Sequence, residues 1–318
     1  MYFNSATIRD EKLVKAVLNE SKLSFLAGEI TRLPGGSNSF ALQIGDYVVR
    51  FPKSESVYQS LRRETLISKT LQKNLPAEQR GKITFPRCRD DVSHPFSWHK
   101  IIKGKICDYV RGETRYNTRY ENLSAGQKDM LAAGIADFLT ELHAIKDRIE
   151  NPEAENWNFF EKDDFDHTAC RDALLKYSGG KIELKEFIAD ISPRDFVFAH
   201  NDMSGSNLII DETSPRVLRG IIDFGKAGFM PRLNEFFPYY KIHRGLARRI
   251  ITCYNRKNGG IIDQTAADYM ALGCFGYFMN KSEKQGKPPS DILLKILGSF
   301  IDDFYQSKTS AASPPCMS

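Results

Sequence analysis

The stretch "AHNDMSGSN" at residues 199–207 decides the fold when it is read together with "IIDFG" at residues 221–225. Each stretch follows an apolar, β-prone run, so each places polar side chains at the end of a predicted strand. The first contains Asp202 and, five residues later, Asn207, and the second contains Asp223 within Asp-Phe-Gly. Two carboxylates and an amide at strand ends indicate a site that holds a metal ion and phosphate oxygens.

The first stretch has the spacing of a kinase catalytic loop, His-x-Asp followed by Asn five residues after the Asp. His200, Asp202 and Asn207 fit this spacing. In such a loop the Asp accepts the proton of the attacking hydroxyl, and Mg²⁺, a hard ion, is held through oxygen atoms. We therefore predict that Asp202 is the catalytic base and that Asn207 and Asp223 are metal ligands. Asn-Asp and Ser-Gly-Ser are also common turn formers, but both halves in order at two strand ends disfavour an ordinary turn.

Together with the preceding helix "FLTELHAI" and strand "HPFSWHKIIKG", these motifs resemble the aminoglycoside phosphotransferase family. The form "HND", with Ser at the second position after the Asp, is similar to the 2″-aminoglycoside phosphotransferases in particular, as is "YVVRFPKSESV" followed by a helix with "RRE". The resemblance implies an α+β, two-lobed, protein-kinase-like fold. It also implies Mg²⁺-dependent transfer of the γ-phosphate of ATP or GTP to a small-molecule hydroxyl.

Patterns of strands and helices support two lobes. "ALQIGDYVVRF" at residues 41–51 predicts a β-hairpin, and a helical pattern follows over about residues 58–75. Ser124 and Gln127 form a capping box that begins a long helix. Strand-like segments return over residues 195–225, and three helical patterns follow, the last beginning at Ser290 after two prolines.

The lobes that we expect are a β-rich N-lobe over residues 1–103 and a larger, mostly helical C-lobe over residues 104–305. Residues 306–318, "QSKTSAASPPCMS", have the composition of a disordered tail.

A glycine-rich turn precedes the hairpin. Gly35 and Gly36 would allow a close approach of the backbone to phosphates, and Ser37 or Ser39 could donate a hydrogen bond. An ordinary hairpin loop explains the same residues, and the turn does not match G-x-G-x-x-G.

The predicted phosphate cation is Arg50. Strand alternation places Val48 and Arg50 on one face, so Val48 would cover the nucleotide base and Arg50 would point at the phosphates. Kinases use a Lys at this position, paired with a Glu on the next helix. Glu64 lies on the apolar face of that helix with Ile67 and Leu71, so it needs a partner, and Arg50 is the natural one.

A protein substrate is disfavoured, because Asn201 replaces the Arg of the kinase His-Arg-Asp triplet and no Ala-Pro-Glu follows Asp-Phe-Gly. His200 is interpreted as structural. The resemblance also implies an Asp near "PRLNEF", where either Asn234 or Glu235 replaces it.

The acceptor is not identified by the sequence. The segment 148–167 carries acidic residues interleaved with aromatic ones, which suits a cationic aminoglycoside, although a solvated acidic loop explains it equally well. Its acidic residues are Glu150, Glu153, Glu155, Glu161, Asp163, Asp164 and Asp166. Macrolides, choline, homoserine and sugar amines remain alternative acceptors. A catalytically inactive, nucleotide-binding regulator is the alternative from another class.

The charge, cysteine and hydrophobicity patterns of the sequence limit the partners and the location that we expect. The net charge of +5 is spread along the chain, and we interpret its densest clusters, "RRE" at 62–64 and "HRGLARR" at 243–249, as solvated helix faces, with no nucleic-acid motif near them. The 6 cysteines show no C-x-x-C pairs, which favours reduced, mostly buried thiols. No secretory signal or membrane-spanning run is visible, so we expect a cytoplasmic protein without a membrane or protein partner.

Overall fold

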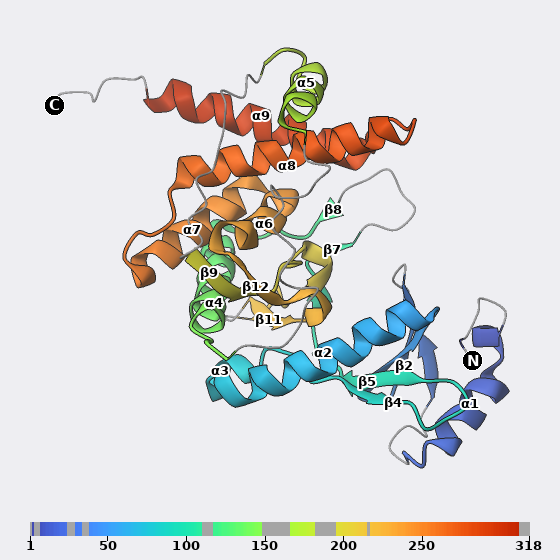
Figure 1. Cartoon of the computed structure of the whole chain (residues 1–318). Helices are drawn as coiled ribbons and strands as arrows, with labels where there is room; N and C mark the ends of the chain where they lie inside the picture. Colours follow the sequence, from blue (N-terminus) through green and yellow to red (C-terminus); the bar gives the residue numbers. More distant parts are fainter. Residues whose placement is uncertain are drawn as a thin grey trace. The chain divides into compact units, whose positions relative to one another are not determined.

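The computed structural model describes residues 2, 7–23, 29–33, 38–109, 117–147, 166–181, 195–214 and 217–311. The chain forms two compact units (Figure 1). The first consists of Met1–Lys103 and Gly220–Ala227, and the second of Gly104–Arg219 and Gly228–Ser318. Residues 220–227, which the sequence interpretation left in the C-lobe, therefore belong to the first unit.

An antiparallel sheet of five strands in the order β1-β2-β3-β5-β4 forms the centre of the first unit. Its strands are β1 (Ile30–Arg32), β2 (Ser39–Ile44), β3 (Tyr47–Pro52), β4 (Arg87–Arg89) and β5 (Phe96–Lys100). The predicted hairpin is confirmed as β2 and β3, with Ile44 opposite Tyr47. Gly45 closes it at φ 56°, a left-handed conformation that glycine adopts without a steric penalty.

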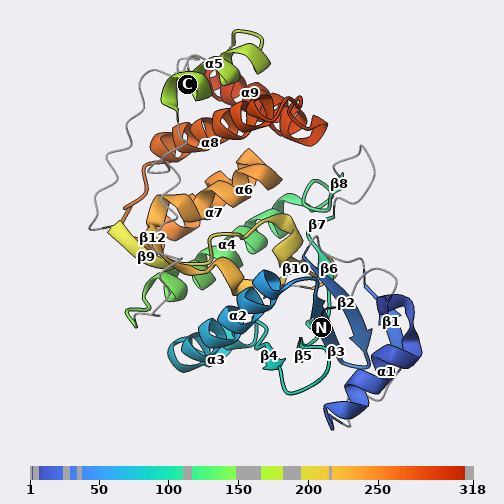
Figure 2. The ribbon, with the colours of Figure 1, turned by 45° about the vertical axis from the view of Figure 1, so that its right-hand side comes forward.

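Helices cover this sheet. The short 3-10 helix η1 (Thr7–Arg9) is followed by α1 (Glu11–Glu20), which lies beside the sheet (Figure 2). The buried valines of α1 belong to the same apolar core as side chains of β2, β3 and β5. The one helix predicted for this lobe is α2 (Glu55–Asn74), which begins at the capping residue Ser54 and buries one face, whereas α1 was not predicted. The short α3 (Ala77–Arg80) follows Pro76.

The segment Gly220–Ala227 is joined to the first unit through its main chain. Strand β11 (Leu218–Ile221) brings Ile221 into a parallel bridge with Ile83, and the N–H of Ile221 donates to the carbonyl of Lys82 over 2.7 Å. A Cβ on Gly220 would lie 2.5 Å from Cδ1 and 2.8 Å from Cγ2 of Ile102, so any larger residue there would displace the Ile102 side chain. This close approach places the Asp-Phe-Gly motif beside α2.

The second unit is mostly helical, as predicted. Its strands are β6 (Lys105–Ile106), β7 (Asp108–Tyr109), β8 (Asn117–Thr118), β9 (Phe196–Ala199), β10 (Leu208–Ile210) and β12 (Gly228–Pro231). Its helices are α4 (Ala125–His143), α5 (His167–Tyr177), α6 (Phe237–Ile242), α7 (Arg244–Asn258), α8 (Gln264–Lys284) and α9 (Asp291–Ala311), with the 3-10 turns η5 (Gly205–Asn207) and η7 (Arg232–Phe236). Both views show α4 beside α7 and α5 beside α8 (Figures 1 and 2).

Several details of this unit test the sequence interpretation. The capping box of Ser124 and Gln127 is confirmed at the start of α4. Four helices rather than three follow residue 225, because α6, with six residues, is too short for a periodic signal. Helix α9 extends to Ala311, so residues 306–311 of the expected disordered tail are helical. The rest of that tail lies outside the described residues.

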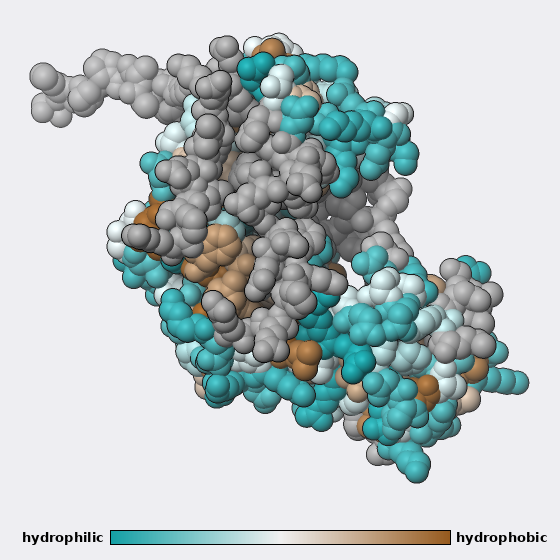
Figure 3. Space-filling view, in the orientation of Figure 1, coloured by the Kyte–Doolittle hydropathy of each residue, from teal (hydrophilic) through white to brown (hydrophobic). Residues whose placement is uncertain are grey.

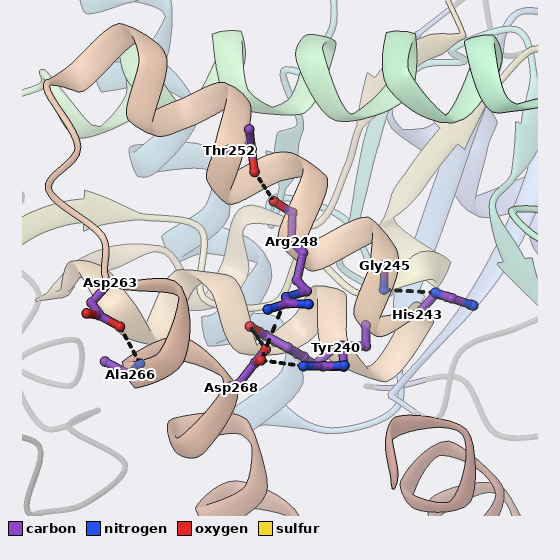
Figure 4. A network of polar contacts seen from close by, with 9 residues as sticks. Tyr240, His243, Gly245, Arg248, Thr252, Asp263, Ala266 and Asp268 are labelled. Atoms are coloured by element: carbon purple, nitrogen blue, oxygen red, sulfur yellow. Dashed lines mark hydrogen bonds and ion pairs between the residues drawn. The ribbon is translucent and has the colours of Figure 1, made fainter. Parts of the chain in front are cut away.

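The basic cluster of α7 is only in part the solvated face that we expected: the side chains of Arg248 and Arg249 are 39% and 41% exposed, but Arg244 lies in the interior. Arg244 is buried and its guanidinium donates to Asp268 of α8 over 2.7 Å, while Tyr240 donates to the other oxygen of that carboxylate. Figure 4 shows Tyr240 and Arg248 directed toward Asp268. The charge pattern alone gave the wrong answer for Arg244, because its partner carboxylate lies on another helix, 24 residues further along the chain.

The surface of the first unit is largely hydrophilic on the face that is drawn in Figure 3. Among the described residues, no helix combines the length and hydrophobicity that crossing a bilayer requires. The five cysteines in the described part of the chain form no disulfide bond with one another, and three of them are buried, which agrees with the predicted reduced, mostly buried thiols.

Candidate active site

One face of the sheet in the first unit carries the residues predicted to contact nucleotide. The register places Val48 opposite His99 and Arg50 opposite Ser97, so all four side chains lie on the same face. Val48 is buried, as are Ser97 and His99. The alternation inferred from the sequence is therefore confirmed for Val48 and Arg50, whereas their roles toward a nucleotide remain predictions.

The ion pair predicted between Arg50 and Glu64 is confirmed. The guanidinium of Arg50 donates from Nη2 to Oε2 of Glu64, and the Glu64 side chain is 1% exposed. Burial raises the pKa of Glu64, and the positive charge of Arg50 opposes that rise. Because each charge is removed from water, each depends on the other for compensation.

Asp223 lies beside this pair in the same unit. Burial alone would lower the pKa of Arg50, but the carboxylates of Glu64 and Asp223 outweigh it and the pKa is raised. The backbone of Asp223 is left-handed, at φ 65° and ψ 66°, and it begins the 3-10 turn η6 (Phe224–Lys226) with Phe224 buried. Arg50, Glu64 and Asp223 therefore form one electrostatic cluster.

The catalytic-loop motif forms a braced turn between β9 and β10 in the second unit. Asn201 adopts a left-handed conformation at φ 64°, which Asn tolerates better than most residues. The N–H of Asp202 donates to Nδ1 of the fully buried His200 over 3.2 Å. The carbonyl of Asp202 accepts from Ser204 N–H and from Nδ2 of Asn207, each over 2.7 Å. The structural role predicted for His200 agrees with these contacts.

Glu235, rather than Asn234, holds this loop through hydrogen bonds to its backbone. Its Oε2 accepts hydrogen bonds from the backbone N–H groups of His200, over 2.6 Å, and Asn201, over 3.2 Å. Oε1 is buried and has no hydrogen-bond partner. Burial raises the pKa of Glu235 to about 8, against the opposing effect of the two backbone donors and with a further rise from the charge of Asp202. The anchor is therefore a neutral acid at neutral pH.

This pKa predicts a pH dependence of stability. Between pH 4.5, the ordinary pKa of the carboxyl group, and about 8, native Glu235 keeps its proton while the unfolded chain releases it. The free energy of unfolding should therefore fall through that range, by about 1.4 kcal/mol for each pH unit at most. Glu235→Gln, which mimics the protonated acid, should remove this part of the dependence.

Urea unfolding of both proteins from pH 5 to pH 8 measures the effect. We expect the wild type to lose stability relative to Glu235→Gln as the pH rises. Glu11→Gln, at an exposed carboxylate of α1, is the matched control and should follow the wild type. Parallel curves for the wild type and Glu235→Gln would show that Glu235 is already ionised at pH 5.

The donor atoms predicted for Mg²⁺ suit that ion. Nδ2 of Asn207 is committed to the carbonyl of Asp202, so Oδ1 is the amide atom left for a ligand. An amide oxygen and the Asp223 carboxylate are hard donors of the kind that Mg²⁺ prefers. Within the described ranges, no group of three or more His, Cys, Asp or Glu side chains could hold a metal by itself.

Comparison with known sequences agrees with this geometry. Residues 29–258, most of the chain, match the sequence model of the phosphotransferase enzyme family. The chain belongs to the phosphotransferase enzyme family. It is a phosphotransferase with an alcohol group as acceptor, that is, a small-molecule kinase. The resemblance seen in the sequence motifs is thereby confirmed at the level of the family. No curated protein sequence matches the chain.

Solved structures share the fold of this phosphotransferase. One is the GDP complex of wild-type aminoglycoside 2′-phosphotransferase-IIIa, with 18% identity, a TM-score of 0.61 and coverage of 94% of this chain and 100% of that chain. Another is ADP-bound aminoglycoside phosphotransferase APH(2″)-Ib, with 22% identity, a TM-score of 0.57 and coverage of 92% and 97%. The apoenzyme of macrolide 2′-phosphotransferase MphH from Brachybacterium faecium has 12% identity, a TM-score of 0.55 and coverage of 96% and 100%. At these identities the likeness shows the kinase-like α+β fold alone.

Some predicted site residues of this phosphotransferase lie outside the described residues. Gly35, Gly36 and Ser37 are among them, as is the acidic segment up to residue 165. Ser39 is described as the first residue of β2, opposite Pro52. Asp166, the last acidic residue of the segment, caps the N-terminus of α5.

Two residues of the Arg50 face were missed by the sequence interpretation. Ser97 and His99 lie on that face because "SWHK" alternates in the strand next to β3. The hydroxyl of Ser97 is buried without a hydrogen-bond partner. Burial, and then the charge of Arg50, lowers the pKa of His99 to about 4, so this imidazole is neutral at neutral pH. The alternation of side chains in "SWHK" could have placed Ser97 and His99 on one face of their strand, but only if this strand had been known to pair with β3.

Proposed function

We propose that the chain transfers the γ-phosphate of ATP or GTP to a hydroxyl of a small molecule in a Mg²⁺-dependent reaction. The observation that carries the proposal is the guanidinium of Arg50. The Nη2 atom of Arg50 donates a hydrogen bond to Glu64, while the Nε atom of Arg50 is buried and has no hydrogen-bond partner. An oriented cation with a free, buried donor favours an anionic ligand such as a phosphate chain. Its position on the Val48 face agrees with a nucleotide there.

The proposed reaction assigns a task to each residue. The hydroxyl oxygen of the acceptor attacks the γ-phosphorus, the bond to the β-phosphate oxygen breaks, and the nucleoside diphosphate leaves with the bonding electrons. The carboxylate of Asp202 accepts the hydroxyl proton. Arg50 binds phosphate oxygens and Glu64 keeps its guanidinium oriented. When Mg²⁺ is bound, it neutralises phosphate charge, and Asn207 and Asp223 are the residues that would hold it.

Asp223→Asn tests the metal assignment. Asn adopts the left-handed conformation of this position as readily as Asp, so the backbone is retained while one carboxylate is lost. We expect the affinity for Mg²⁺-nucleotide to fall at least about tenfold, and the affinity for nucleotide in EDTA to stay the same or rise. Isothermal titration with and without Mg²⁺ measures both. Asp46→Asn, in the exposed hairpin turn, is the control. An unchanged Mg²⁺ dependence in Asp223→Asn would refute the assignment.

An aminoglycoside is the acceptor that we favour. The resemblance of the "HND" motif to the 2″-aminoglycoside phosphotransferases and the acidic, aromatic segment 148–167 support it. A phosphate-transfer assay with ATP or GTP against aminoglycosides, macrolides, choline, homoserine and sugar amines tests the proposal. Transfer to an aminoglycoside confirms it, and transfer to another acceptor alone corrects the acceptor class. Nucleotide binding without transfer to any member of the panel favours the regulator.

A further inference from the structure

A cavity lies within the first unit. Its volume is about 640 Å³, within the range of pockets that hold small molecules. It is lined by α2, α3, the segment that leads into β4, and the ends of β3 and β5. Helix α2 contributes Thr65, Ser68, Lys69 and Gln72, which share one stripe at spacings of three and four residues.

This cavity is distinct from the proposed phosphate face. Its residues from the sheet are Tyr47, Trp98 and Lys100. Tyr47 pairs with Lys100 in the register, and Trp98 pairs with Val49, one residue before Arg50. Because successive side chains of a strand alternate, these three lie on the opposite face from Arg50. Helix α2 reaches the Arg50 face, because the hydroxyl of Thr65 contacts Cys88, which pairs with Ser97. None of the residues that we assign to the nucleotide lines the cavity, however, so an occupant would not contact them.

Every charged side chain that lines the cavity is a cation. They are Lys69, Arg80, Arg87 and Lys100, and no carboxylate accompanies them. Arg80 donates to the carbonyl of Gln72 over 3.0 Å. Lys69, Arg87 and Lys100 form no ion pair with any described residue. Like charges around one cavity repel each other unless an anion lies between them.

A buried polar group gives a second, independent indication. Thr84 lines the cavity and is only 4% exposed, yet its hydroxyl has no hydrogen-bond partner. Leaving a buried hydroxyl unpaired is unfavourable, and a ligand oxygen would satisfy it. Ile83, Phe85 and Trp98 supply apolar surface in the same cavity. The cavity therefore combines an apolar wall, a buried donor and a cationic rim.

We propose that this cavity binds a small organic anion, with an aromatic or aliphatic body and a phosphate or carboxylate group. The body packs on Trp98 and its apolar neighbours. The anionic group contacts the cationic rim and accepts a hydrogen bond from Thr84. The proposal concerns binding alone and stands whether or not the proposed phosphate transfer is correct.

Isothermal titration of the full chain with 1-naphthyl phosphate tests the proposal. We expect saturable binding of one molecule, weaker at high salt, and unchanged when ATP is present at saturation. Inorganic phosphate and neutral 1-naphthol should each bind at least about tenfold more weakly, because each lacks one half of the ligand. The same experiment with 1-naphthoate distinguishes a carboxylate from a phosphate requirement. Equal binding of 1-naphthol, or complete displacement by ATP, would overturn the assignment.

Variants locate the binding. The double variant Lys69→Ala/Arg87→Ala should bind 1-naphthyl phosphate at least about tenfold more weakly. Thr84→Val keeps the shape and should weaken binding about two- to tenfold, while the free energy of unfolding without ligand stays the same or rises. Lys73→Ala, at an exposed lysine of α2 outside the cavity, is the matched control and should bind like the wild type. Wild-type affinity in both Thr84→Val and the double variant would refute the proposal.

Discussion

Asp202→Asn is expected to lose phosphate transfer by roughly 10²–10⁴-fold while it keeps its affinity for nucleotide. The amide has the size of the carboxylate but cannot accept the hydroxyl proton at neutral pH. The main-chain hydrogen bonds of Asp202 with His200, Ser204 and Asn207 are retained in this variant, so the loop should keep its conformation. Steady-state transfer assays, together with nucleotide titration, measure the two properties separately.

Asp211→Asn is the matched control for this prediction. Asp211 follows β10 and its carboxylate accepts hydrogen bonds from Thr213, outside the catalytic loop. It should leave turnover unchanged. Full activity in Asp202→Asn would remove Asp202 from the role of base. A loss of nucleotide binding in that variant would instead show that the side chain holds the loop together.

Arg50→Ala should destabilise the first unit and weaken nucleotide binding and turnover together. It leaves Glu64 buried with no compensating charge, which costs roughly 3–5 kcal/mol when burial is complete, as it nearly is here. Arg50→Lys keeps the charge and loses only the planar fork, so measurable transfer should remain. Urea unfolding and transfer assays on the three proteins provide the measurements.

A second substitution separates stability from function at this position. Arg50→Ala combined with Glu64→Leu removes both charges and should recover much of the stability, but not the affinity for nucleotide. Lys53→Ala, at an exposed lysine just after β3, should affect neither. Wild-type binding and turnover in Arg50→Ala would show that Arg50 is not the phosphate cation. Under the regulator alternative, no protein of this series would transfer phosphate.

The sequence predicts best where a local pattern determines the result. Period-two alternation placed Val48 and Arg50 on one face, and helical periodicity placed Glu64 on a buried face, so their partnership could be inferred from two short segments. The capping box at Ser124 is equally local. Each of these patterns needs only a few neighbouring residues, which is why the structure agrees with it.

The features that could not be predicted from the sequence are contacts between segments that are far apart in the chain. Asn234 and Glu235 are neighbours in a 3-10 turn, whose short length gives no periodicity to choose the buried one. The basic residues of α7 resembled a solvated face until α8 supplied Asp268. Likewise, nothing near residues 220–227 indicates that they pair with Lys82 and Ile83. Such contacts arise only when the whole chain has folded.

The discontinuous first unit has a consequence for protein synthesis. Met1–Lys103 emerges from the ribosome first, but Gly220–Ala227 emerges only after the intervening stretch of the second unit. Until then the carbonyl of Lys82 lacks the N–H of Ile221, and the Arg50–Glu64 pair lacks the adjacent carboxylate of Asp223. The nascent N-terminal segment therefore cannot complete its native contacts until a strand that is synthesised much later is available. A gene split between residues 103 and 220 would place two parts of the same folding unit on separate chains.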